Sequence, residues 1–582
     1  MVKTILSQVK EFKWVSILTP VCMIGEVICE MIIPILMGRI VDLGIYGNDM
    51  GFILRTGALM IAVALCGLFF GVMGGIFGAR ASAGLVRNLR KTMYDNIQTF
   101  SFANIDKFST SGLVTRLTTD VTNIQNAFQM ILRMAMRAPV SMIVALIMSI
   151  SISPRLSSIY LVAVVFLAIV IALMMGRTTR YFKQVFERYD DLNASVQENV
   201  SAIRVVKAYV REDYEIGKFR KAAQNIYEMF CKAELNIAVI GPIMSTVVYS
   251  CILLISWFGA HMIVAQELTT GNLMSLLTYC MNILMSLMMV SMVFVMITMS
   301  EASARRIAEV INEKSSLTNP EDPIMEVPDG SIVFKDVDFS YRPGGGEPVL
   351  KDVSLSIRSG ESIGIIGGTG SAKSSLVNLI SRLYDVTQGA VLVGGHDVRE
   401  YDMEVLRDQV SVVLQKNVLF SGTILDNLRW GDPDATLEDC QRVCRMACAD
   451  EFIEQFPDGY ETKIEQGGTN VSGGQKQRLC IARALLKKPK VLILDDSTSA
   501  VDTATDAKIR RAFAEEIPNT TKLIIAQRIA SVKDLDRIIV MEDGRVNGFG
   551  THDELLRDNA IYREVYESQV GAGADADFDK KE

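Results

Sequence analysis

A glycine-rich stretch in the second half of the chain has the residue types that bind phosphate. Residues Ser362–Ser375 read S-I-G-I-I-G-G-T-G-S-A-K-S-S, a hydrophobic strand followed by a loop that opens a helix. The backbone N–H groups of such a loop, the helix N-terminus and the Lys373 ammonium all direct positive charge at phosphate oxygens, and the Ser374 hydroxyl is a ligand for Mg²⁺. We therefore predict a nucleotide-phosphate site made by Gly367, Gly368, Thr369, Gly370, Ser371, Ala372, Lys373, Ser374 and Ser375.

Two further segments fit the same chemistry. Residues 491–496 (V-L-I-L-D-D) form a hydrophobic strand that ends in two carboxylates, and Asp495 is placed to bind the magnesium shell. Residues 471–475 (V-S-G-G-Q) form a second glycine-rich turn that opens a helix, and its backbone amides can also bind phosphate.

In this order along the chain, the motifs resemble the nucleotide-binding domain of ATP-binding-cassette (ABC) transporters. The residues that carry the resemblance are Tyr341, Gly367 to Ser374, Gln415, V-S-G-G-Q at 471–475, Asp495 and S-A-V-D at 499–502. The resemblance implies ATP and Mg²⁺ as cofactors. Tyr341 would stack on adenine, Lys373 would contact the β and γ phosphates, and Ser374, Gln415 and Asp495 would complete the Mg²⁺ environment.

The same resemblance implies a dimer. The signature turn, made by Ser472, Gly473, Gly474 and Gln475, would close over the ATP that the opposite subunit holds. Two such domains would then sandwich two nucleotides between them.

The sequence departs from the family pattern at three positions. Asp496 stands where the family has the glutamate that polarises the attacking water, and Gln527 stands where it has a histidine. A shorter carboxylate weakens general-base catalysis, and an amide cannot become cationic. Ala372 replaces the glycine before the lysine, which costs roughly 1 kcal/mol if the backbone φ is positive and little if it is not.

The catalytic positions Asp496 and Gln527 both concern hydrolysis, whereas the nucleotide-binding residues and the signature turn remain. Our hypothesis is that the chain is the degenerate subunit of a heterodimeric ABC exporter. Its partner would be a related half-transporter with Glu and His in its ATP site. Two alternatives stay open, namely a homodimeric exporter with slow ATPase activity and a nucleotide-gated regulatory or channel-like protein. Tolerated drift in the active site would also account for the two changes, but both of them strike the hydrolytic step while the binding residues and the signature turn remain, which argues against drift.

The chain has 582 residues, which is too long for one hydrophobic core, so these motifs must belong to one of at least two domains. The composition, 49% hydrophobic and 21% charged, indicates that part of the surface faces lipid. About twenty apolar residues are needed for a helix to cross a bilayer. Six segments meet that length, at Trp14–Leu36, Phe52–Phe77, Ala127–Ile150, Ser158–Met175, Ile237–Val264 and Leu273–Met299.

Lys and Arg residues concentrate in the segments after the second and fourth spans, which places these segments and both termini in the cytosol. Each of these two segments is expected to turn once, near Asn104–Gly112 and Ala208–Tyr214, where it could touch a cytosolic domain. We expect a multi-pass protein of a bacterial cytoplasmic membrane with a cytosolic nucleotide-binding domain. The net charge of −7 argues against nucleic acid as a partner.

Candidates for cargo binding lie inside the spans. Glu26, Glu30, Arg133 and Arg137 are ionisable groups in apolar segments, where such groups line cavities, pair with one another or snorkel. Met281, Met285, Met288, Met292 and Met296 recur on one helical stripe, which is typical either of helix packing or of a lining for variable hydrophobic ligands. The cargo, a small molecule, a lipid or a peptide, is left open.

The predicted fold class is therefore a membrane α-helical domain of six helices with long cytosolic extensions, joined to an α/β P-loop NTPase domain of the ABC type. The expected boundaries are 1–302 for the transmembrane domain, 303–330 for a linker, 331–570 for the nucleotide-binding domain and 571–582 for a disordered tail.

Overall fold

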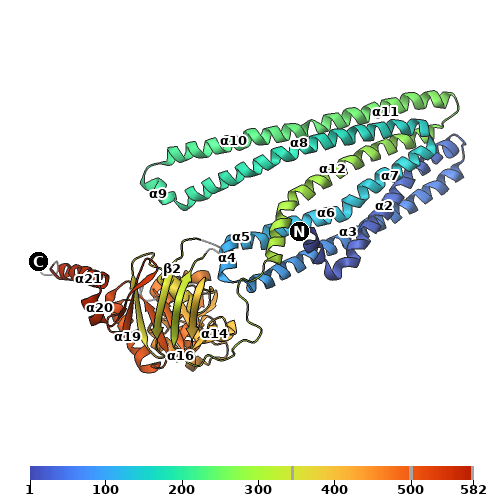
Figure 1. Cartoon of the computed structure of the whole chain (residues 1–582). Coiled ribbons are helices and arrows are strands. Elements are labelled where there is room, and N and C mark those ends of the chain that lie inside the picture. The colour runs from blue at the N-terminus through green and yellow to red at the C-terminus, as the bar shows by residue number, and fades with distance from the viewer. Residues whose placement is uncertain (342–345, 497–501, 579–582) are drawn as a thin grey trace. The chain divides into compact units, whose positions relative to one another are not determined.

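The computed structural model describes residues 1–341, 346–496 and 502–578 (Figure 1). They divide into two compact units, which we call the helical unit and the sheet unit. The helical unit comprises Met1–Gln98 and Ser111–Glu313, and the sheet unit comprises Thr99–Thr110 and the chain from Lys314 onward.

The helical unit confirms the six predicted spans. Within the described residues, six helical stretches are long and apolar enough to cross a membrane: Lys10–Ile45, Met50–Gln98, Thr110–Ile152, Pro154–Thr178, Glu212–Val264 and Thr270–Asn312. Its α-helices are α1 (Val2–Ser7), α2 (Lys13–Arg39), α3 (Met50–Gln98), α5 (Thr110–Thr115), α6 (Val121–Met130), α7 (Met136–Ile152), α8 (Pro154–Ser201), α9 (Ile203–Ala208), α10 (Glu212–Ala238), α11 (Ile240–Val264) and α12 (Thr270–Asn312).

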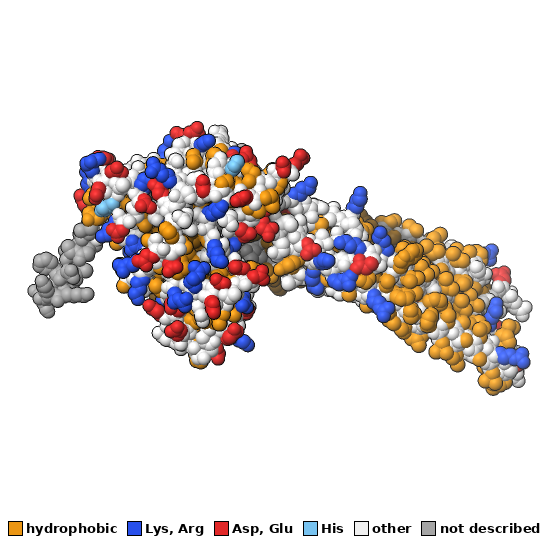
Figure 2. Space-filling model, turned by 90° about the horizontal axis from the view of Figure 1, so that it is seen from below, with side chains coloured by type: hydrophobic (Ala, Val, Ile, Leu, Met, Phe, Trp, Pro, Cys, Tyr) orange, Lys and Arg blue, Asp and Glu red, His pale blue; other side chains and the backbone are white. Residues whose placement is uncertain are grey.

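Five of the six apolar stretches, at 36 to 53 residues, are much longer than a bilayer requires. Helices α8 and α10 lie side by side, and the short α9 lies at the far end of this pair (Figure 1). The turn expected near Ala208–Tyr214 is found at residues 209–211, between α9 and α10. Figure 2 shows a nearly continuous field of hydrophobic side chains on one face of the helical unit, with Lys and Arg along its border, as expected for a surface in contact with lipid.

Helices α2 and α12 approach each other backbone to backbone at one end. A Cβ atom on Gly271 would lie 2.1 Å from the carbonyl oxygen of Gly38, so only glycine fits there. The Asp42 carboxylate accepts hydrogen bonds from the Thr269 hydroxyl at 2.6 Å and from the Gly271 N–H at 2.8 Å. Deeper in the pair, the buried Tyr279 hydroxyl donates to the Met31 carbonyl oxygen at 2.6 Å.

Two expected boundaries differ from the observed elements. Helix α12 continues to Asn312, into the segment expected to be a linker, because its last turns bury Ser303, Ile307 and Val310. Arg306 on these turns also donates to the Asp120 carboxylate, at 2.7 Å from its Nε. Helix α21 (Ala560–Phe578) likewise continues into the expected tail. The disorder of that tail stays a prediction.

The sheet unit is built on a six-stranded sheet with the strand order β12-β11-β3-β10-β9-β6. Strands β11, β3, β10, β9 and β6 are parallel to their neighbours, and β12 pairs antiparallel with β11. A second, antiparallel sheet has the order β2-β1-β4-β5, and β7 pairs with β8. The strands are β1 (Ile332–Phe339), β2 (Leu350–Ile357), β3 (Ser362–Gly367), β4 (Gln388–Val393), β5 (His396–Asp397), β6 (Val410–Val413), β7 (Gly422–Thr423), β8 (Lys463–Ile464), β9 (Val491–Asp495), β10 (Thr521–Ile525), β11 (Arg537–Glu542) and β12 (Arg545–Gly550).

Helices surround these sheets, and hydrophobic cores lie between the layers. One core joins the two larger sheets to helix α13, another lies between β9 and the helices α15 to α19, and a third packs β11 against helices α20 and α21. The α-helices of the sheet unit are α4 (Phe102–Phe108), α13 (Lys373–Ile380), α14 (Met403–Gln409), α15 (Ile424–Leu428), α16 (Leu437–Met446), α17 (Asp450–Ile453), α18 (Gly473–Leu486), α19 (Thr503–Glu516), α20 (His552–Asp558) and α21.

Candidate nucleotide site

The central parallel strands bring most of the predicted site residues to one edge of the sheet. Strands β3, β10, β9 and β6 are consecutive neighbours, so their carboxyl ends lie side by side. The phosphate loop follows β3, Gln527 follows β10, Asp495 and Asp496 end β9, and Gln415 follows β6. Residues separated by more than a hundred positions in sequence thus share one rim.

The phosphate loop is formed as predicted, between β3 and α13. The Lys373 ammonium donates to the carbonyl oxygens of Gly367 at 2.9 Å and Gly368 at 2.7 Å, and to the Ser371 hydroxyl at 3.2 Å. Burial lowers the pKa of this ammonium, and the carboxylates of Asp495 and Asp496 act in the opposite direction. The lysine is therefore held inside the loop, at the position where phosphate oxygens would accept hydrogen bonds from its ammonium group.

Ala372 adopts the left-handed backbone conformation, with φ +71° and ψ +24°. The sequence left open whether the backbone φ at position 372 is positive. It is positive, and in this conformation the Cβ of alanine is strained. The Ala372 side chain packs against the hydrophobic core beneath α13, and this contact offsets part of the strain. Gly370, two residues earlier, also has a positive φ, +85°.

Ser374 and Asp495, which the sequence predicts to be Mg²⁺ ligands, lie in contact with each other. The Ser374 hydroxyl donates to Asp495 Oδ1 at 3.0 Å. Burial raises the pKa of the Asp495 carboxyl, with a further contribution from Asp496, against the lowering effects of the Ser374 hydrogen bond and Lys373. A divalent cation would relieve the cost of this buried charge, so the residues present fit Mg²⁺. Gln415, the third expected ligand, is exposed at the same edge of the sheet.

The two altered catalytic positions contact each other. Gln527 Nε2 donates to Asp496 Oδ2 at 2.8 Å. Asp496 has a positive φ of +50°, and Gln527 is exposed. The pair can orient a water molecule or a phosphate oxygen through hydrogen bonds, but its amide has no titratable proton.

Tyr341 lies beside the phosphate-loop helix. Its hydroxyl is 2.9 Å from the Ser375 hydroxyl, and its ring packs edge-on against Phe339 with 4.7 Å between centroids. The side chain is 42% exposed, which leaves ring surface available to a flat ligand such as a purine base.

The signature turn opens helix α18 through a capping box. The Ser472 hydroxyl accepts from the Gln475 N–H at 3.3 Å, and the Gln475 side chain accepts from the Ser472 N–H at 2.8 Å. Ser472 and Gly473 are exposed, so the turn presents its hydroxyl and amides at the surface. Of the S-A-V-D segment, residues 499–501 lie outside the described residues, and Asp502 caps helix α19.

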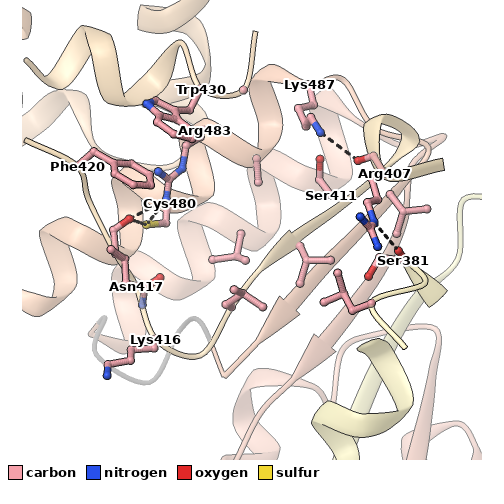
Figure 3. Close-up of a pocket in the computed structure, with 18 of the residues that line it drawn as sticks. Ser381, Arg407, Ser411, Lys416, Asn417, Phe420, Trp430, Cys480, Arg483 and Lys487 are labelled. Carbon is pink, nitrogen blue, oxygen red and sulfur yellow. Dashed lines mark hydrogen bonds between the residues drawn. The ribbon is translucent and has the colours of Figure 1, made fainter. Parts of the chain in front are cut away.

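A groove of about 450 Å³ lies on the sheet unit, away from the phosphate loop. Figure 3 shows Phe420 and Trp430 stacked at one end of it, with ring centroids 4.1 Å apart. Its other lining residues include the valines of β6, and the cations around it are Arg407, Lys416, Arg483 and Lys487.

Two functional candidates escaped the sequence analysis, namely Tyr384 and Asp106. The Tyr384 hydroxyl donates to Asp106 Oδ2 at 2.8 Å, which joins residues 278 positions apart and places helix α4 against the rest of the sheet unit. The expected turn near Asn104–Gly112 therefore does contact this unit, through α4. The only sequence signal for this contact was the position of the turn.

Three of the four ionisable cargo candidates form one ion-pair cluster in the helical unit. Arg137 donates to Glu26 Oε1 at 2.8 Å and to Glu30 Oε2 at 3.0 Å. Arg133, one turn away on the π-helical segment Ile131–Ala135, is exposed. Of the alternatives that the sequence left open for Glu26, Glu30 and Arg137, the structure shows pairing with one another.

The methionine stripe lies on the face of α12 that the chain's own packing leaves open. Met281, Met285, Met288 and Met292 are exposed, whereas Tyr279, Ile283 and Leu287 on the other face are buried. Met296 is half-buried. Packing within this chain therefore does not explain the stripe.

Comparison with known proteins agrees with this architecture. Residues 16–306 match the family described as ABC transporter transmembrane region, and residues 350–499 match the family described as ABC transporter. The uncharacterized ABC transporter ATP-binding protein YfiB of Bacillus subtilis (strain 168) is 34% identical over 566 residues, which cover 97% of this chain and 98% of that protein.

Two further proteins are similar over most of the chain. The mitochondrial potassium channel ATP-binding subunit of Mus musculus is 32% identical over 567 residues, covering 94% of this chain and 78% of that protein. The solved structure of a bacterial Atm1-family ABC exporter with ATP bound matches with a TM-score of 0.80 at 23% identity, covering 95% of this chain and 97% of that one. A likeness at this identity shows the fold.

Proposed function

The chain belongs to the ABC transporter family, and we propose that it is the subunit of a heterodimeric exporter whose own ATP site binds nucleotide but hydrolyses it slowly. The observation that carries the proposal is the Gln527–Asp496 pair. In this pair a non-titratable amide takes the histidine position, and a carboxylate one methylene short takes the glutamate position. Around it, Lys373, Ser374 and Asp495 keep the arrangement that binding requires.

The binding roles follow residue by residue. Tyr341 stacks on adenine, the phosphate loop and Lys373 hold the β and γ phosphates, and Ser374, Gln415 and Asp495 complete the Mg²⁺ shell. The exposed signature turn supports a second role, in which Ser472 and Gly474 close over the nucleotide of a partner subunit. That partner carries Glu and His in its own site and performs most of the hydrolysis.

The groove on the sheet unit supports the same pairing. We assign it to the turn between α9 and α10 of the partner, a turn that in this chain has Tyr209 and Val210 exposed by 76% and 80%. The apolar tip suits the Phe420–Trp430 end of the groove, and the acidic start of α10 suits the cations around it. Closure of two sheet units on ATP then moves the membrane helices.

The decisive experiment is co-purification of the tagged full chain from its source, followed by sequencing of the bound subunit. A related chain with Glu and His at the positions of Asp496 and Gln527 supports the proposal. A purified chain that self-associates and turns over MgATP at tens of molecules per second overturns it.

The exposed methionine stripe supports an amphipathic or hydrophobic cargo. Unbranched thioethers adapt to ligands of different shape, whereas β-branched side chains do not. Replacing Met285, Met288 and Met292 by Ile keeps the surface apolar and is expected to narrow the range of transported compounds. Met50→Ile, at an equally exposed site at the start of helix α3, is the control. An unchanged range in the triple variant removes the stripe from the cargo path.

A second function is favoured by one comparison, the similarity to a mitochondrial potassium channel ATP-binding subunit. In this alternative, slow hydrolysis times the gating of an ion pathway instead of driving transport. Recording of ion currents from the reconstituted protein separates the two. A nucleotide-dependent conductance supports the channel-like function, and its absence together with ATP-dependent cargo uptake into vesicles supports the exporter.

A further inference from the structure

Tyr384 lies between helix α4 and the tyrosine that is expected to bind the nucleotide base. On one side its hydroxyl donates to Asp106 of α4 at 2.8 Å, and its ring lies 6.1 Å from that of Phe102, also in α4. On the other side its ring packs at 89° against Tyr341, with 5.0 Å between centroids. Tyr384 is thus in direct contact with both.

Tyr341 has few ways to move without disturbing this arrangement. Its hydroxyl is hydrogen-bonded to Ser375, next to the Mg²⁺ ligand Ser374, and Phe339 and Tyr384 pack against its ring. A base that stacks on the exposed part of the ring therefore presses on Tyr384 or fixes it in place. Edge-to-face contacts of this kind stabilise an aromatic pair beyond the area they bury.

We propose that Tyr384 is a positioning residue that couples the base-binding Tyr341 to helix α4, so that the segment leading from membrane helix α3 senses an adenine base in this site. The proposal rests on the proposed function only in that Tyr341 stacks on the base of ATP. Under this proposal a site that hydrolyses slowly still has a function, because the binding of ATP alone changes how firmly α4 is held.

The hydrogen bond to Asp106 is what holds the Tyr384 side chain in one orientation against α4. A hydroxyl that donates to a carboxylate makes a stronger bond than a neutral pair does. Burial, and then the Asp106 carboxylate, raise the pKa of the Tyr384 hydroxyl, so it remains a donor throughout the physiological range. The ring contact with Phe102 alone would leave Tyr384 free to rotate away from α4.

The first test measures the affinity of the purified full chain for a non-hydrolysable ATP analogue, adenylyl-imidodiphosphate, and for inorganic tripolyphosphate, which has no base. Coupling between sites is reciprocal, so a change on the α4 side must alter base binding. Tyr384→Phe keeps the ring and removes the bond to Asp106. We expect it to weaken binding of the analogue by about five-fold and to leave tripolyphosphate binding unchanged. Equal changes for both ligands, or none, overturn the proposal.

Tyr401→Phe is the matched control, because the buried Tyr401 hydroxyl donates to the Val393 carbonyl oxygen at 2.7 Å in the same unit. It removes one hydroxyl from the same core, and both ligands should respond to it alike. If Tyr401→Phe also weakens binding of the analogue but not of tripolyphosphate, the effect comes from general destabilisation of the sheet unit. That result would overturn the role of Tyr384.

The second test follows α4 directly by amide hydrogen exchange of residues 99–110. In the parent chain we expect the analogue to slow this exchange and tripolyphosphate not to, and in Tyr384→Phe we expect neither to do so. Exchange that responds equally to both ligands, or that responds in the variant as in the parent, refutes the coupling. Because the analogue is not hydrolysed, these results do not depend on how fast the site hydrolyses ATP, and the proposed function can fail separately.

Discussion

The side-chain amide of Gln527 donates a hydrogen bond to the carboxylate of Asp496, with 2.8 Å between Nε2 and Oδ2. The two residues that depart from the family's hydrolytic pattern are therefore in contact with each other, at the carboxyl ends of neighbouring strands β10 and β9. Because the amide holds the carboxylate without supplying or accepting a proton, we propose that both departures act on one chemical step, the activation of water.

Restoring both side chains should restore hydrolysis. The double variant Asp496→Glu/Gln527→His is expected to raise MgATP turnover of the full chain in lipid nanodiscs by about ten-fold or more, because a well-placed general base contributes at least that much. Each single change alone should give less, since the two groups act on one water. Asp496→Asn/Gln527→His is the control, and it should remain as slow as the parent. Equal turnover in both double variants would contradict the assignment.

The strain at Ala372 should be measurable as stability. Ala372→Gly removes the Cβ at a φ of +71° and is expected to stabilise the protein by up to about 1 kcal/mol, read as a higher midpoint of thermal unfolding. Ala482→Gly, in the buried interior of helix α18, should lower the midpoint by a similar amount. If both changes lower it, packing of the Ala372 methyl group outweighs the strain. Affinity for ATP should survive Ala372→Gly.

The raised pKa of Asp495 gives a pH dependence with a defined sign. The folded chain keeps a proton on this carboxyl at pH values where the unfolded chain has lost it, so the group's favourable contribution is present in acid and is lost as pH rises through the raised value. Without nucleotide, Asp495→Asn should therefore gain stability over the parent as pH increases from 4 to 8. Thermal unfolding measures this directly.

Asp502→Asn is the control of opposite sign for that experiment. Hydrogen bonds from the Thr505 backbone and hydroxyl hold the pKa of Asp502 below its ordinary value. Its contribution is thus present above the ordinary pKa and lost in acid, so Asp502→Asn should be less stable than the parent at neutral pH and should approach it as pH falls. Asp495→Asn curves that run parallel to the parent at every pH would refute the assigned burial of the Asp495 charge.

Variants of the cluster formed by Arg137, Glu26 and Glu30 can distinguish a structural role from a cargo-binding role. Arg137→Leu leaves the carboxylates of Glu26 and Glu30 without their cation and is expected to destabilise the chain by about 2 kcal/mol. Adding Glu26→Gln and Glu30→Gln should recover most of that loss. If the triple variant also retains ATP-driven uptake of a cationic dye, the cluster serves the fold. If it is stable and uptake is lost, the cluster contacts cargo.

The sequence predicted structure best where the interacting residues are close together along the chain. A buried strand, a glycine-rich loop and a lysine at the start of a helix occupy consecutive positions, so the loop from Gly367 to Ser374 could be predicted whole. The six spans followed from length and hydropathy alone, although their cytosolic ends did not. Helix α12 runs on to Asn312 because Ser303 and Arg306 contact Asp120, a residue more than 180 positions earlier.

Contacts between distant segments were beyond the sequence. The partner of Tyr384 and the sharing of Arg137 by two glutamates depend on how segments meet, and no spacing along the chain reports it. The backbone angle of Ala372 depends on loop closure between β3 and α13. The exposure of the methionine stripe depends on which face of α12 the neighbouring helices cover. Each of these was left as an open alternative or was not anticipated.

The crossing of α2 and α12 at Gly38 and Gly271 also bears on how these helices can part. At that end one of the two contacts of Asp42 comes from the exposed Thr269 hydroxyl, so water can take the place of that hydrogen bond at little cost. Farther along, the Ser275 hydroxyl donates to the Pro34 carbonyl oxygen at 2.8 Å and the Tyr279 hydroxyl donates to the Met31 carbonyl oxygen, and both bonds are buried from water that could replace them. Separation of the two helices is therefore easiest as a splaying that starts at the Asp42 tip and stops at Ser275, the first buried bond from that end.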